Sequence, residues 1–73
     1  MTQARLDEQK FADEIRKFLK KVGITSHIEL EKAVRAAVAG GQIDTSQPLR
    51  ALMVLEVPAI GLRHTVDHSL QLE

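Results

Sequence analysis

Two runs of hydrophobic residues with helical spacing occupy the first half of the chain. The first predicts a helix over about 8–22, with apolar residues on one arc of the helical wheel and most basic residues on the opposite arc. Asp7 is the expected N-cap, because its carboxylate can accept hydrogen bonds from N–H groups of the first turn. Gly23 is expected to end this helix in the left-handed conformation. The apolar arc comprises Phe11, Ile15, Phe18, Leu19 and Val22.

The second run predicts a helix over about 27–39. Ser26 and Glu29 fit a capping box, in which each side chain binds a free backbone N–H at the helix start. The two glycines at 40–41 are expected to end this helix. Its buried stripe is expected to comprise Leu30, Ala33, Val34, Ala37 and Val38.

The second half of the chain predicts an antiparallel β-hairpin. Residues 49–57 are rich in apolar and β-branched side chains and are flanked by prolines, which is typical of a strand. Residues 62–72 alternate between apolar and polar side chains, which predicts a second strand. A tight turn between them places Val57 opposite Leu62. The other pairs expected in this register are Leu55 with His64, Met53 with Val66, Ala51 with His68, Leu49 with Leu70 and Glu56 with Arg63.

Together these elements predict an α+β fold in a single domain over 1–73, with 1–6 as a disordered lead-in. A two-stranded sheet is weak alone, and both of its strands have an open edge. We therefore expect the sheet to be extended by dimerisation. The alternative is a compact monomer whose strand edges are solvated.

The composition also favours self-association. The core of a 73-residue chain contributes no more than about 3–5 kcal/mol of net stability, and the absence of cysteine excludes disulfides and thiolate metal sites. Ten basic and ten acidic residues balance, so no net charge attracts nucleic acid or an anionic membrane. No apolar run reaches the ~20 residues that span a bilayer, and the N-terminus lacks the apolar segment of a signal peptide. These features predict a cytoplasmic homodimer.

The stretch IRKFLKKVGITS over 15–26, followed by LEKAVR over 30–35, resembles a small family of uncharacterised bacterial proteins. The similarity continues through the hairpin to the end of the chain, and 1–6 resembles an extension beyond it. The family is one of unknown function without assigned catalytic residues. The resemblance therefore implies a bacterial origin and no site.

Five residues are candidates for the dimer interface. Two apolar side chains of the first strand fall on the face of the hairpin that is otherwise polar. Three residues of the second helix lie off its main stripe and form a second face, although alanines also simply favour a helix. The candidates are Leu52, Val54, Ile28, Ala36 and Ala39.

Four basic residues of the first helix support an alternative, nucleic-acid-associated function. Two helices joined at a glycine are compatible with a helix-turn-helix, in which these cations would contact phosphates. The second helix opens with acidic residues, however, and these would repel phosphates. The candidate phosphate contacts are Arg16, Lys17, Lys20 and Lys21.

No pattern predicts a catalytic, cofactor or metal site. His64 and His68 lie on one strand face, where a four-residue spacing separates them by roughly 13 Å, so a single chain cannot chelate a metal with this pair. Ser69 points to the face opposite His68 and cannot be activated by it. The expected function is that of a small non-enzymatic interaction or accessory protein without a cofactor.

Overall fold

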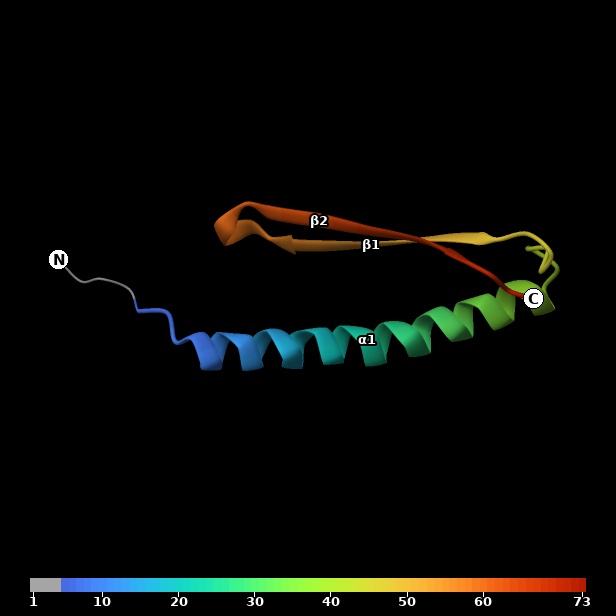
Figure 1. Cartoon of the computed structure of the whole chain (residues 1–73). Helices are drawn as coiled ribbons and strands as arrows, with labels where there is room; N and C mark the ends of the chain where they lie inside the picture. The colour runs from blue at the N-terminus through green and yellow to red at the C-terminus, as the bar shows by residue number, and fades with distance from the viewer. Residues whose placement is uncertain (1–4) are drawn as a thin grey trace. The chain divides into compact units, whose positions relative to one another are not determined.

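The computed structural model describes residues 5–73 and contains one long helix followed by a β-hairpin (Figure 1). The helix α1 spans Glu8–Ala39, and the strands β1 and β2 span Leu49–Val57 and Leu62–Leu70. A short 3-10 helix, η1, covers Pro58–Ile60 between the strands. The α+β class is confirmed.

The chain divides into two compact units, Met1–Ala36 and Ala37–Glu73. The first contains nearly all of α1 and the second contains the hairpin. The single domain over 1–73 stays a prediction. The expected lead-in over 1–6 lies mostly outside the described residues; its described part, Arg5 and Leu6, precedes α1.

The prediction of two helices, over about 8–22 and 27–39, is wrong, because α1 continues through Gly23. The glycines with a positive φ among the described residues are Gly41 and Gly61, so Gly23 does not adopt the left-handed conformation that would stop a helix. The hydroxyl of Thr25 donates to the carbonyl oxygen of Lys21 at 2.8 Å, a bond that holds it within the helix. Ser26 lies inside α1 and forms no capping box.

One apolar stripe joins the two predicted segments. Residues spaced 11 apart lie almost in line along an α-helix, because this spacing makes about three turns. Phe11, Val22 and Ala33 have this spacing, as do Leu19 and Leu30. A break at residue 23 would separate two surfaces that are already in phase, whereas a glycine in a helix interior costs only about 1 kcal/mol. The stripe comprises Phe11, Ala12, Ile15, Phe18, Leu19, Val22, Ser26, Leu30, Ala33, Val34 and Ala37.

Both ends of α1 are capped as predicted. The Asp7 carboxylate accepts a hydrogen bond from the Lys10 backbone N–H at 3.0 Å, which satisfies a donor of the first turn. At the other end, Gly41 has a φ of 69° and donates to the carbonyl of Val38 at 3.1 Å. The Gln42 N–H donates to Ala37 at 2.9 Å, which completes a Schellman motif.

The hairpin has the predicted register. Val57 pairs with Leu62, Leu55 with His64, and the pairing continues to Leu49 with Leu70. Gly61 closes the turn with a φ of 66°. β2 ends at Leu70, two residues before the predicted end of the strand. The alternating pattern and the turn both require this register. A slip of one residue would move every side chain of a strand to the opposite face of the sheet.

None of the described residues is buried. Fifteen large apolar side chains expose more than a third of their surface, and they include members of the α1 stripe and of both strands. The stripe residues Phe18 and Leu19 are about half exposed, at 50% and 52%. The described residues therefore have amphipathic elements without a hydrophobic core.

Replacement of Gly23 by alanine tests the continuity of α1. A Cβ at this position meets nothing within 4 Å in the chain, and the backbone is already helical. Gly23→Ala should therefore raise the free energy of unfolding by about 0.5–1 kcal/mol, because alanine loses less backbone entropy on folding. Urea unfolding at one fixed protein concentration, followed by helical circular dichroism, measures the change.

Gly61→Ala is the matched control. Its positive φ strains an alanine, so this variant should be less stable than the natural chain. A Gly23→Ala variant that is destabilised to the same extent would contradict a continuous helix.

Candidate functional site

The two strand residues proposed for the dimer interface lie on an exposed face of the hairpin. Leu52 is 56% exposed and stands opposite Asp67, while Val54 is 44% exposed and stands opposite Thr65. Since alternate strand residues share a face, these two side chains lie on the same side of β1. They form an apolar step on a face that is otherwise polar.

Ion pairs flank this apolar step. Arg50 binds Asp67 in a bidentate arrangement, with Nη2 2.7 Å from one carboxylate oxygen and Nε 3.2 Å from both. The carboxylate raises the pKa of Arg50, so this guanidinium stays charged at any relevant pH. The predicted pair of Glu56 and Arg63 is confirmed, with 4.0 Å between charged atoms. All four side chains are largely exposed, so these ion pairs contribute little to the stability of the fold.

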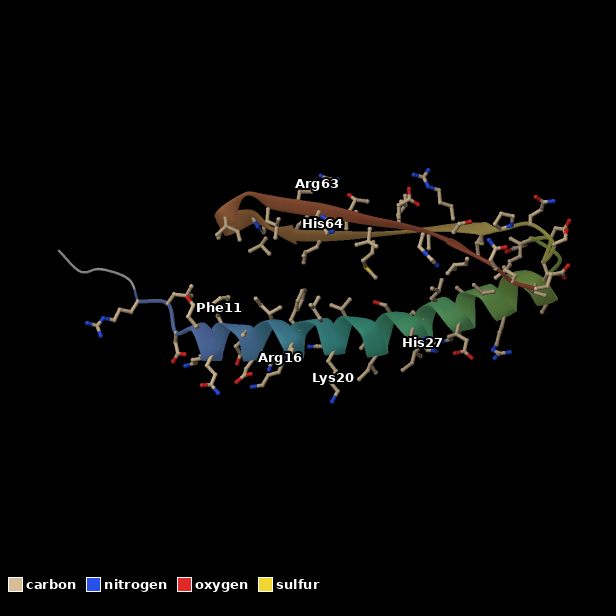
Figure 2. The ribbon with its side chains drawn as sticks, in the orientation of Figure 1. Phe11, Arg16, Lys20, His27, Arg63 and His64 are labelled. Carbon is tan, nitrogen blue, oxygen red and sulfur yellow. The ribbon has the colours of Figure 1, made fainter. Side chains whose placement is uncertain are left out.

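The other face of the hairpin carries the apolar cross-strand pairs and both strand histidines. His64 stands opposite Leu55 and His68 opposite Ala51, as the register predicts. Figure 2 shows that the neighbours Arg63 and His64 project from opposite faces of β2. Both histidines lie on β2, four residues apart. At ~3.3 Å per residue this separation is too large for one chain to chelate a metal with both.

On α1 the three helix candidates do not share one side. Ile28 and Ala39 are 11 residues apart and nearly in line, whereas Ala36 is about five turns beyond Phe18 and therefore lies in line with that stripe residue. Ile24 lies one turn before Ile28 on the same side of α1, and the side chains of Ile28 and Ile24 are 57% and 53% exposed. Sequence reasoning missed Ile24 because it was placed in the expected hinge. The 11-residue spacing is the signal that would have found it.

The four cations proposed for phosphate contact lie around α1 and are not equally available. Arg16 binds Asp13 at 2.7 Å and Lys17 binds Glu14 at 3.4 Å, so acids one turn earlier partly neutralise both. Figure 2 shows Arg16 and Lys20 on the side of α1 away from Phe11. The helix-turn-helix on which the nucleic-acid hypothesis depended is not formed, since α1 is unbroken.

A ladder of three polar residues follows one side of α1. Glu31 lies between His27 and Arg35, with oxygens 3.0 Å from the His27 Nε2 and 2.9 Å from the Arg35 Nη2. The spaced pair of Glu31 and Arg35 is the helix contact expected for opposite charges four residues apart. The hydrogen bond and charge of Arg35 are the largest causes that lower the pKa of Glu31, and His27 adds to them.

The loop before β1 is closed by its own polar groups. Asp44 accepts hydrogen bonds from the backbone N–H of Ser46 at 3.0 Å and from its hydroxyl at 2.7 Å. These bonds lower the pKa of Asp44. Thr45 donates to the carboxylate of Glu73 at 2.8 Å, which ties the loop to the end of the chain.

Within residues 5–73, no three or more potential metal-ligating His, Asp or Glu side chains come together. In the same part of the chain, α1 is too polar to be a candidate for crossing a membrane. The candidate functional surfaces of the described residues are therefore exposed apolar faces bordered by ion pairs.

Replacement of Arg35 tests the ladder through the ionisation of Glu31. Arg35→Gln should raise the pKa of Glu31, and His27→Ala should raise it less, because Arg35 makes the larger contribution. A carboxyl whose pKa is lower in the folded chain stabilises the fold above its unfolded pKa, and this contribution disappears as the pH falls through the folded pKa. The acid side of the stability curve should therefore flatten in Arg35→Gln. NMR titration of the Glu31 carboxyl provides the measurement, and equal shifts in the two variants would contradict the assignment.

The comparisons with known proteins identify a family. No curated protein and no solved structure matches the chain significantly. The model of a family of unknown function, DUF6494, matches residues 6–73, which include all of α1 and the hairpin. The resemblance to a family without assigned function is thereby confirmed. The chain belongs to the DUF6494 family of unknown function.

Proposed function

We propose that this chain is a small non-enzymatic interaction protein of the cytoplasm that works as a homo-oligomer, most simply a dimer. The observation that carries the proposal is that no residue among 5–73 is buried, although α1 and the hairpin are both amphipathic. Ordering each residue costs about 1–2 kcal/mol of backbone entropy, and burial of apolar surface is the main compensation. A second copy supplies that burial.

The polar chemistry of the described residues supports a non-enzymatic role. The hydroxyls of Thr45 and Ser46 donate to carboxylates, and that of Thr25 donates to a backbone carbonyl. These bonds are exposed, and none of them pairs a hydroxyl with an imidazole, the base that most often activates a serine or threonine nucleophile. His27 is paired with Glu31, which leaves it engaged in the ladder on α1.

The hairpin offers one surface for this association. The sheet of the described residues has two strands, so each strand keeps an unpaired edge. An unpaired edge is a template for a strand from another chain, and Leu52 and Val54 add apolar area beside it. Extension of the sheet across two subunits would pair the backbone groups of the strand edge. The same contact would also cover the apolar step.

Concentration dependence of stability tests the self-association. If the folded state is an oligomer, its thermal midpoint rises with protein concentration by mass action, whereas that of a monomer does not. Sedimentation equilibrium over the same range should show a mass above that of the 8.1 kDa chain. A constant midpoint together with a monomer mass would overturn the proposed function.

A paired substitution tests the sheet surface. Leu52→Lys with Val54→Lys should lower the mass in solution and the thermal midpoint at high protein concentration, because moving two added charges from water into an apolar interface is unfavourable. Ser69→Glu is the control for an added charge, since Ser69 lies on the same face but outside the apolar step and stands opposite Arg50. An oligomer that survives the paired substitution unchanged would remove this surface from the interface while leaving self-association intact.

The alternative function is association with nucleic acid through the basic residues of α1. Its support is the segment 16–21, which contains four cations and no acid. Two of these cations already bind acids of the preceding turn, so we expect no binding to duplex or single-stranded DNA at ~50 mM salt. Fluorescence anisotropy with labelled DNA measures this. Binding that weakens steeply toward ~200 mM salt, and that is lost in Lys20→Gln with Lys21→Gln, would favour the alternative.

A further inference from the structure

We propose that two copies of α1 pair antiparallel along the apolar stripe, with Val22 of each copy at the crossing point. This inference rests on the proposed self-association and assigns it a surface and a direction. The stripe is continuous over most of a 32-residue helix, which is about 48 Å long at ~1.5 Å per residue. Because its members repeat at a spacing of 11 residues, they stay on one side of the helix and can meet a second straight helix along their length.

The sizes of the stripe residues favour the antiparallel direction. Before the crossing point the stripe is bulky, with Phe11, Ile15 and Phe18. After it, the stripe contains several small residues, including Ser26 and Ala33. Antiparallel pairing about residue 22 places Phe11 against Ala33 of the partner subunit and Phe18 against Ser26 of the partner subunit. Alternation of large and small side chains across facing positions fills the space between helices, whereas parallel pairing places phenylalanines together and leaves voids between the small residues.

The charges along α1 favour the same direction. Segment 7–14 has four acids and one lysine, a net charge of −3, and segment 16–21 has a net charge of +4. Parallel pairing in register brings each segment beside its own copy, so like charges repel. Antiparallel pairing about residue 22 places 16–21 beside 23–28, which contains no Asp, Glu, Lys or Arg. It places 7–14 beside 30–37, where two basic residues and one acid give a net charge of +1.

Engineered cysteines provide a direct test, because the natural chain contains none. Ala12 and Ala33 both belong to the stripe and are close neighbours between subunits in the proposed register, since Ala33 faces Phe11, the residue before Ala12. Within one chain they are about 31 Å apart along the helix at ~1.5 Å per residue, so an intrachain disulfide is impossible without unfolding α1. The double variant Ala12→Cys with Ala33→Cys should form a covalent dimer in a glutathione redox buffer. Each single variant should remain a non-covalent species that runs as a monomer on a non-reducing gel.

Two further variants set the register and the face. Val22→Cys alone should cross-link to Val22→Cys of the partner subunit, because residue 22 lies on the two-fold axis of the proposed pair. Lys10→Cys with Ala33→Cys should not cross-link, because Lys10 lies on the side of α1 away from the stripe.

Each remaining outcome overturns the inference in a recognisable way. Efficient cross-linking of both single variants at 12 and 33 indicates parallel pairing. A protein that sediments as an oligomer but forms none of the expected cross-links uses another surface or register, and self-association itself stands. A monomer at every concentration removes the inference and the proposed function together.

Discussion

The unbroken apolar stripe of α1 is the feature on which the remaining structure depends. A long helix is not stable in water through its own hydrogen bonds, since most helical stability in proteins comes from packing of an apolar face. The stripe extends from Phe11 to Ala37, and several of its large residues, such as Ile15, Phe18 and Leu19, are about half exposed. Burial of one such Leu, Ile or Phe side chain contributes about 1.5–3 kcal/mol. Burial of the stripe is therefore a large source of stability for α1.

The hairpin has the same requirement in another form. Among residues 5–73 the two strands pair only with each other, so the outer edges keep unpaired backbone groups and both faces keep exposed apolar side chains. A helix cannot satisfy the strand edges, because its backbone groups bind one another and it offers only side chains. The two proposals concern different contacts: side-chain packing along α1, and backbone pairing or face packing at the hairpin. The proposals for the two surfaces are therefore complementary.

The sequence predicted the hairpin more completely than the helix. Alternation along residues 62–72 and the turn at Gly61 independently require the same pairing, and together they determine the register from Leu49–Leu70 to Val57–Leu62. In α1, residues typical of a helix end conflicted with an apolar pattern that extends over the whole helix. Gly23 and the apparent capping box at Ser26 are typical of a helix end, but the 11-residue spacing of the stripe continues across them. The predicted break at residue 23 is wrong because the phase of the whole apolar pattern determines the helix more than these single residues do.

The candidate surfaces were less predictable than the elements that carry them. Leu52 and Val54 could be found from the sequence because a strand assigns its faces by simple alternation, and the correct register preserves that assignment. On a helix, faces depend on phase over many residues, so the assumed break grouped Ala36 with Ile28 and concealed Ile24.

The ion pairs have a corresponding role. Exposed pairs such as Arg50 with Asp67 and Glu31 with Arg35 contribute little to the stability of one chain. We propose that they contribute to specificity, since charges that border an apolar face repel partners with a like charge pattern and attract partners with a complementary one. In the dimer that we propose, the apolar faces supply the tendency to associate, and the charges beside them select the direction and the register of the partner.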